Sequence, residues 1–276
     1  MSLFIASLNS GSNGNCYYIG NETEAILVDA GISCREIEKR MKRLGLQIQK
    51  VKAVFVSHEH SDHIKGLSVL SNKYNLPVYT TITTLSQGYF KVQEHLVRHL
   101  NAHEKVTVGN ISITPFPKHH DACDPYSFII SSNHTKVGVF TDIGTVCKNV
   151  VSYFGQCHAA FLESNYDVKM LDLGNYPYFL KQRIRGGVGH LSNEQALDLF
   201  VNHRPAFMSH LFLSHLSKNN NCPHLVNELF TAHAGHVQIV IASRYEETPV
   251  YHIGGTFLKS KELKRVPMLM QQMEFS

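Results

Sequence analysis

The chain has 276 residues, of which 43% are hydrophobic and 17% charged, so it is long enough to bury a substantial core. Its formal net charge of +4 is too small to identify a polyanionic partner by itself. No apolar run approaches the roughly 18 residues of a membrane span, and residues 1–6 lack the basic region of a secretory signal. We therefore expect a cytoplasmic protein that does not bind a membrane.

Cysteine and histidine are the informative metal-binding residue types. The six cysteines never approach C-x-x-C spacing, which disfavours a cysteine-based zinc site. We expect them to be reduced thiols that mostly fill the core. Histidine is unusually frequent, with 18 copies.

Strands and helices alternate through the first half of the chain. Apolar segments predict strands at residues 3–8, 16–19, 24–28, 52–57 and 77–81. Helices are predicted at 33–44, where Ser33 and Glu36 form a capping-box pattern, and at 64–74. This alternation predicts an α/β protein with helices packed on the faces of a sheet.

The second half begins with strands and ends with mixed elements. Strands are predicted at 105–108, 111–115, 126–131, 136–140, 207–213 and 237–242, with a hairpin turn at 133–134 and a strand-like end at 250–257. Helices are predicted at 178–185, 192–203 and 223–234. Because no repeat, low-complexity tract or linker interrupts the chain, we expect a single domain over residues 1–276.

A dense group of histidines follows the predicted strand at 52–57. His58 and His60 are two positions apart on an extended segment, so both can face one ion. Asp62 and His63 come after the chain turns and can face a neighbouring position. Imidazole and carboxylate groups suit zinc, manganese or iron. A polar surface loop is the alternative, but it gives no reason for so many such residues at one strand end.

Three other predicted strands end in side chains of the same kind. His119 and His120 follow the strand at 111–115, Asp142 follows the strand at 136–140, and His215 follows the strand at 207–213. Each could be an ordinary polar surface residue if taken alone. Together with the first group, they indicate a metal site at one edge of a sheet.

The segment 58–63, H-x-H-x-D-H, resembles the signature of the metallo-β-lactamase superfamily, and 27–31 (LVDAG) resembles its first motif. This resemblance implies a four-layer αβ/βα sandwich with mixed sheets and two divalent ions per chain. One ion would be held by His58, His60 and a third histidine, and the other by Asp62, His63 and His215, with Asp142 bridging. His120 matches the third position better than His119, because Asp and Ala follow it.

Five further segments resemble the WalJ/YycJ-like branch of this superfamily: 10–19, 119–125, 163–167, 176–196 and 213–221. That branch implies 5′→3′ exonuclease activity on DNA. The ions would be zinc or manganese, with iron possible, and would supply a bridging hydroxide as the nucleophile at neutral pH. The substrate would be nucleic acid, with DNA favoured over RNA.

Two residues are assigned to catalysis and three to substrate binding. Asp62 is expected to act through the second ion, and the resemblance implies that His190 donates a proton to the leaving alkoxide. A histidine that caps the following helix is the alternative interpretation of His190. Asn15, Lys218 and Asn219 could bind flanking phosphates, although turns select Asn for structural reasons as well.

Rival functions use the same fold. A thioester hydrolase of the glyoxalase II type would not need His190 as a proton donor, and a small-molecule phosphodiesterase or a non-catalytic scaffold are further alternatives. Asp142 and His215 are 73 residues apart (215 − 142), which is too few for the inserted domain of a ribonuclease J-like protein. The native metal, the strand polarity and the oligomeric state are left open by the sequence.

Overall fold

The computed structural model describes residues 2–254, which contain fourteen strands. The first sheet is made of β1 (Leu3–Asn9), β2 (Cys16–Gly20), β3 (Ala25–Val28), β4 (Val51–Phe55), β5 (Val78–Thr80), β6 (Val97–His99) and β14 (Tyr251–Ile253). The second is made of β7 (Val106–Val108), β8 (Ile111–Pro117), β9 (Tyr126–Ser132), β10 (Thr135–Phe140), β11 (Ala159–Glu163), β12 (His210–Ser214) and β13 (Gln238–Ile241).

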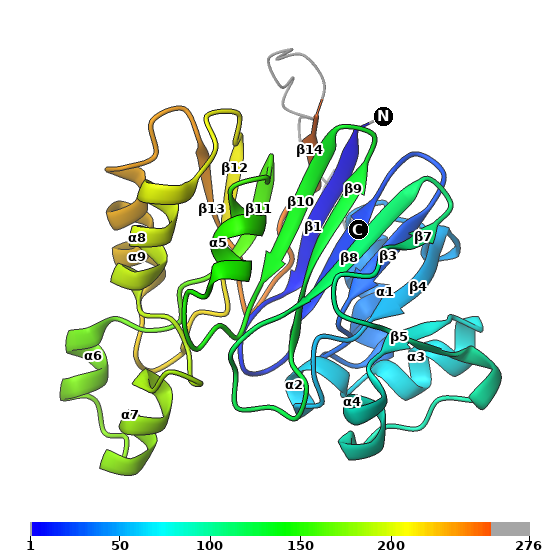
Figure 1. The fold of residues 1–276 in the computed structure, drawn as a ribbon, viewed down its shortest axis with the longest axis horizontal. Coiled ribbons are helices and arrows are strands. Elements are labelled where there is room, and N and C mark those ends of the chain that lie inside the picture. The colour runs from blue at the N-terminus through cyan, green and yellow to red at the C-terminus, as the bar shows by residue number, and fades with distance from the viewer. Residues whose placement is uncertain (1, 255–276) are drawn as a thin grey trace, which may run out of the picture.

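Helices flank the outer face of each sheet, α1 and α3 beside the first and α5, α8 and α9 beside the second (Figure 1). The helices of the described residues are α1 (Cys34–Arg43), α2 (Ser61–Ile64), α3 (Leu67–Tyr74), α4 (Ile82–Gln87), α5 (Lys148–Phe154), α6 (Val168–Leu173), α7 (Tyr178–Arg185), α8 (Asn193–His203) and α9 (Pro223–Thr231), with short 3-10 turns at Ile48–Lys50 and Glu94–Leu96. Within residues 2–254, no helix combines the length and the apolar character that crossing a membrane requires.

Both sheets are mixed, and each has seven strands. The first has the order β14-β1-β2-β3-β4-β5-β6, antiparallel from β14 to β3 and parallel from β3 to β6. The second has the order β13-β12-β11-β10-β9-β8-β7, parallel from β13 to β10 and antiparallel from β10 to β7. The predicted αβ/βα sandwich with mixed sheets is therefore confirmed.

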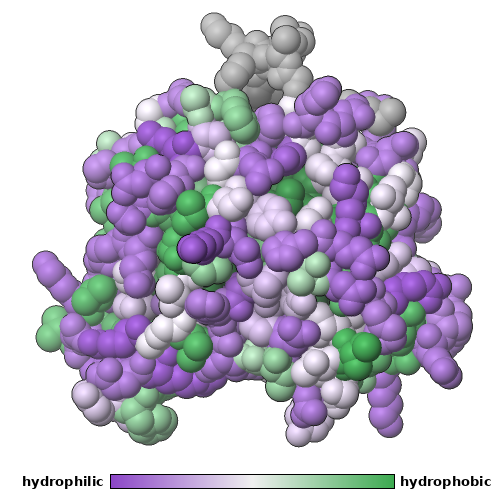
Figure 2. All heavy atoms as spheres, in the orientation of Figure 1, coloured by the Kyte–Doolittle hydropathy of each residue, from purple (hydrophilic) through white to green (hydrophobic). Residues whose placement is uncertain are grey.

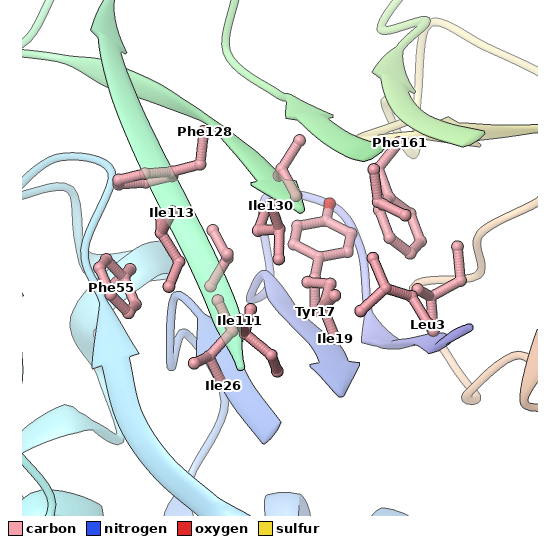
Figure 3. Close-up of a cluster of buried hydrophobic side chains, with 14 of the residues drawn as sticks. Leu3, Tyr17, Ile19, Ile26, Phe55, Ile111, Ile113, Phe128, Ile130 and Phe161 are labelled. Carbon is pink, nitrogen blue, oxygen red and sulfur yellow. The ribbon is translucent and has the colours of Figure 1, made fainter. Parts of the chain in front are cut away.

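Alternating residues of the strands fill two kinds of hydrophobic core, one between the sheets and one under the outer helices. In β12, Phe212 faces the other sheet, whereas Leu211 and Leu213 pack under the outer helices. This burial on both faces explains why the strands are continuous apolar runs. Between the sheets, Tyr17 packs against Phe161 with ring centroids 4.8 Å apart, as the close-up of this core shows (Figure 3).

Several predicted elements differ from those observed. The helix expected at 64–74 is two helices, α2 and α3, because the chain bends at Gly66, where a Cβ atom would lie 2.0 Å from the Ile32 carbonyl oxygen. The strand expected at 207–213 begins only at His210, after a turn closed by Met208 N–H and the Pro205 carbonyl. The expected strand at 250–257 is β14, and its part beyond residue 254 lies outside the described residues.

Other local expectations were correct or incomplete. Ser33 accepts a hydrogen bond from Glu36 N–H, and Ser192 forms a reciprocal capping box with Gln195. The sequence did not predict β6, α4, α5, α6 or β11, and β11 lies in the centre of the second sheet.

The parallel strands bring their carboxyl ends to one edge of the sandwich. Loops after β3, β4, β8, β10, β11 and β12 meet there, and α2 lies at this edge in the lower part of Figure 1. Backbone hydrogen bonds hold the loops together: Gly31 N–H donates to Asn15 O at 2.8 Å, and Asn15 N–H donates to Asp62 O at 2.7 Å.

Gly31→Ala should destabilise this edge. Its Cβ atom would lie 1.7 Å from the Asp62 carbonyl oxygen, so one of the loops must move. We expect a loss of roughly 2–3 kcal/mol in unfolding free energy, measured by chemical denaturation. Gly155→Ala is the control, because its nearest neighbours would be 3.5 Å away. Equal stability of the two variants would contradict this close approach.

Candidate metal centre

The buried carboxylate of Asp29 organises the histidine loop after β4. Asp29 has a left-handed backbone (φ 62) and is fully buried. Its Oδ1 accepts from Ser57 N–H at 2.8 Å, and its Oδ2 accepts from the Ser57 hydroxyl at 2.8 Å and from His63 Nδ1 at 2.7 Å. The three bonds fix the orientation of both the loop and the His63 ring.

These bonds also determine the protonation of His58. The single Ser57 hydroxyl proton goes to Asp29, so His58 Nδ1, which lies 2.9 Å from Ser57 Oγ, must be the donor of that second bond. His58 Nε2 then carries a lone pair, and it lies 3.0 Å from His60 Nδ1. Two imidazole nitrogens at this separation can be ligands of one ion.

The second sheet holds its histidines in the same manner. His120 Nδ1 donates to the Gly189 carbonyl at 3.0 Å, and His215 Nδ1 donates to Glu163 Oε1 at 2.9 Å. His63, His120 and His215 therefore all use Nδ1 for a protein acceptor and direct Nε2 into the cluster, where His63 Nε2 lies 3.1 Å from Asn15 Nδ2. Such outer bonds fix the ring and the tautomer of a metal-binding histidine.

Polar atoms gather without partners where the two sets of loops meet. Within residues 2–254, His120 Nε2, His215 Nε2 and Asp142 Oδ2 are buried and have no hydrogen-bond partner. An unpartnered buried polar atom is costly, and a cation would satisfy all three. The donor set, of imidazoles and carboxylates, suits a divalent transition metal. The residues present therefore fit a metal centre.

Four overlapping groups have ligand atoms within 4.8 Å of one another. They are His58, His60 and His120; His58, His63 and Asp142; Asp62, His63 and His215; and Asp142, Glu163, His190 and His215. The structure thus brings together every metal-site residue named from the sequence, from segments up to 157 residues apart (215 − 58).

The pKa values reflect two different surroundings. Burial lowers the pKa of His58 well below its usual value and that of His120 to about 4, so both rings are neutral, as metal ligands must be. Burial alone would lower the pKa of His215 as well, but the charge of Asp142, the Asp62 carboxylate 3.5 Å from its Nε2 and the hydrogen bond to Glu163 raise it to about 10. The acidic half of the cluster thus attracts positive charge.

The neighbouring histidines 119 and 120 differ in exposure. His120 is buried against His58 and His60, with ring centroids 4.9 and 5.2 Å away. His119 is exposed and pairs through its backbone with the loop at Thr145. Only the His120 ring lies in the cluster.

Glu163, at the end of β11, is a site residue that the sequence analysis did not identify. It is fully buried, and its Oε2 accepts from Ile143 N–H at 2.8 Å and Leu191 N–H at 3.1 Å. Its Oε1 accepts from His215 Nδ1 and, at 2.8 Å, from His190 Nδ1. The run AAFLE at 159–163 is an apolar strand that ends in an acid, the same signal that identified the other strand ends.

Lys118 is a second residue of the site that was not predicted from the sequence. Its side chain is buried, and Nζ donates to the Thr141 carbonyl at 2.6 Å, directly before Asp142. Burial lowers its pKa, which the negative charges of Asp142, Asp29 and Glu163 partly offset. Its amino group therefore lies next to the acidic cluster and is held there by the Thr141 carbonyl.

The three expected substrate-binding residues lie in different surroundings. Asn15 is fully buried, and its Nδ2 lies 3.1 Å from His63 Nε2 and 3.2 Å from Asp62 Oδ2. Lys218 and Asn219 are exposed in the loop after His215. Lys218 lines a pocket of about 320 Å³ that also contains Ser10 and Arg244. Asn219 Nδ2 donates to Tyr176 OH at 3.1 Å.

The chain is similar to a known protein family and to named proteins over most of its length. A family model described as the beta-lactamase superfamily domain matches residues 24–215. The exodeoxyribonuclease YycJ of Bacillus anthracis is 37% identical over 233 residues, covering 82% of this chain and 86% of the relative. The exodeoxyribonuclease WalJ of Streptococcus pneumoniae is 32% identical over 238 residues, covering 83% of this chain and 88% of the relative.

Solved structures show the same fold. The metallo-beta-lactamase fold protein YhfI from Bacillus subtilis superposes with a TM-score of 0.70 at 15% identity. The match covers 91% of this chain and all of that protein.

Glu163→Gln tests whether the buried carboxylate supports the cluster. The two carboxylate oxygens of Glu163 together accept four hydrogen bonds. A glutamine would replace one of these oxygens with an NH₂ group, which would face existing N–H donors. We expect a loss of roughly 2–4 kcal/mol in unfolding free energy, measured by denaturation. Glu228→Gln on the exposed face of α9 should change stability by less than about 0.5 kcal/mol. Wild-type stability of Glu163→Gln would show that these bonds do not hold the site.

Proposed function

This chain belongs to the beta-lactamase superfamily, in its WalJ/YycJ-like exonuclease branch, and from that premise we propose that it is a metal-dependent 5′→3′ exonuclease acting on DNA. The observation that carries the proposal is its likeness, over most of its length, to relatives that are named exodeoxyribonucleases. The buried histidine and aspartate cluster supports a hydrolytic phosphodiesterase mechanism.

We propose two divalent ions, zinc or manganese with iron as a third candidate. His58, His60 and His120 would hold one, Asp62, His63 and His215 the other, and Asp142 would lie between them. When bound, such a pair stabilises charge on a phosphoryl oxygen and lowers the pKa of a coordinated water to about 7. The short distances between the ligand atoms of each group support this assignment.

His190 is proposed to protonate the leaving sugar oxygen. Its Nδ1 donates to Glu163, which leaves Nε2 directed away from that bond, and the side chain is partly exposed beside the buried Asp142. Glu163 would stabilise the positive charge on the ring before the proton leaves. An alkoxide is a poor leaving group, so P–O cleavage benefits from this acid.

Lys218 and Asn219 are proposed to contact flanking phosphates, and Asn15 to position Asp62 and His63. The exposure of Lys218, and its place in a pocket with Arg244, support the first role. The burial of Asn15 against Asp62 and His63 supports a positioning role in place of the substrate contact expected from the sequence.

The proposal is tested with protein loaded separately with zinc and manganese. We expect 5′-phosphorylated single-stranded DNA to be shortened from its 5′ end, with slower hydrolysis of RNA and none of S-lactoylglutathione. Preferred hydrolysis of the thioester would support the glyoxalase II-like alternative and refute the nuclease. Activity on small phosphodiesters alone would support the other alternative.

His120→Ala and His119→Ala form a matched pair for the ligand assignment. His120→Ala should lose about one ion per chain, because a buried Nε2 without a protein partner is removed. His119→Ala removes an exposed ring and should keep the wild-type metal content. Elemental analysis after dialysis measures both, and the reverse order of loss would refute the assignment.

His190→Ala should reduce kcat on DNA by roughly 10²–10⁴-fold, the usual contribution of general acid–base catalysis, with KM and metal content little changed. The defect should shrink on bis(p-nitrophenyl) phosphate, because p-nitrophenolate leaves without protonation. Steady-state kinetics on both substrates measure the difference. Equal slowing of the two would refute the proton donor role even if the nuclease activity stood.

A further inference from the structure

An arm, residues 168–190, leaves the body of the second sheet and returns at His190. It contains α6 and α7, which project at the lower left of Figure 1. The structure describes all of α7, and none of its residues is buried. A helix normally buries an apolar face, so this exposure calls for a binding partner.

Aromatic and apolar side chains are exposed along the arm. Tyr178 and Phe179 expose 77% and 72% of their surfaces, and Leu173 exposes 86%. Figure 2 shows apolar side chains, coloured green, at the lower left, where Figure 1 places α6 and α7.

Positive charge is concentrated in the same segment. The arm has four basic side chains against one acidic, whereas the whole chain has a net charge of +4. These basic residues are Lys169, Lys181, Arg183 and Arg185, and the acidic residue is Asp172. Arg183 pairs with Asp121 at 2.5 Å and Arg185 pairs with Asp172, but these are exposed pairs of small net strength. Their guanidinium groups therefore remain available to phosphates.

The base of the arm is continuous with the metal centre. His190 N–H donates to the Ile184 carbonyl at 2.8 Å, and Asp121 N–H donates to the Val188 carbonyl at 2.8 Å. His120 donates to the carbonyl of Gly189. On the other side, Tyr176 accepts from Asn219 in the Lys218 loop.

We propose that the arm is a platform for single-stranded DNA, on which bases stack against Tyr178 and Phe179 while phosphates contact Lys181 and the neighbouring arginines. This inference rests on the proposed nuclease function. Exposed aromatics interleaved with cations are the pattern by which proteins hold single strands without reading their sequence. An arm that binds a protein partner would not need this positive charge. The position of the arm beside His190 also directs a bound DNA strand to the metal centre.

The test compares Tyr178→Ala/Phe179→Ala with Phe207→Ala. Phe207 is also exposed, at 53%, but it precedes β12 and so lies at the opposite end of that strand from His215. The probe is a fluorescein-labelled oligothymidylate with phosphorothioate linkages, followed by fluorescence anisotropy. We expect the double variant to weaken binding by roughly tenfold or more and the control by less than about twofold.

An abasic strand separates stacking from charge. It keeps its phosphates but offers no bases, so the wild type should bind it about as weakly as the double variant binds oligothymidylate. The double variant should bind both strands equally and should hydrolyse bis(p-nitrophenyl) phosphate at the wild-type rate.

Unchanged affinity in the double variant, including a case in which the arm serves a protein partner, would overturn the platform. The platform would also be overturned if the double variant lost as much activity on bis(p-nitrophenyl) phosphate as it lost affinity for DNA, because the arm would then merely support the site. A wild type that binds DNA through the arm but does not cleave it would refute the nuclease and leave the platform standing.

Discussion

A buried carboxylate must be surrounded by donors, and this constraint organises the site from both sheets. Asp29 at the end of β3 gathers Ser57 and His63 in the first sheet, and Glu163 at the end of β11 gathers His190 and His215 in the second. Each acid is fully buried, so each donor is held in one orientation. These bonds orient the Nε2 atoms of His63 and His215, so the candidate metal centre depends on the hydrogen-bond network behind it.

Backbone strain is concentrated at the same edge. Asp29, Asp142 and His215, which follow β3, β10 and β12, have φ angles of 62, 56 and 55°. Non-glycine residues adopt this left-handed conformation at a cost that the surrounding structure must offset. Here the backbone turns sharply as each strand ends, which places an acid or a histidine at the edge of the sandwich where the loops meet. The strain thus contributes to the geometry of the site.

The sequence predicted the residues of the site better than their supports. The sequence pattern alone identified strands that end in His, Asp or both. The two-sheet arrangement followed from the family resemblance. Glu163 escaped because its strand, 159–163, was not recognised, and an acid on an unassigned segment has no predicted direction. The choice between His119 and His120, and the burial of Asn15, depend on long-range packing. The exposure of α7 could not be seen either, since its apolar residues are those of an ordinary amphipathic helix.

The first and the last strand of the described residues are neighbours in one sheet. Leu3 in β1 pairs with Ile253 in β14, and the Ser10 hydroxyl accepts from the backbone N–H of His215. Closing a contact between such distant positions costs loop-closure entropy, which slows folding. During synthesis the histidines after β4 emerge long before His215, so a growing chain carries half of a centre that it cannot complete. The hydrolytic site is thereby incomplete until synthesis has passed His215.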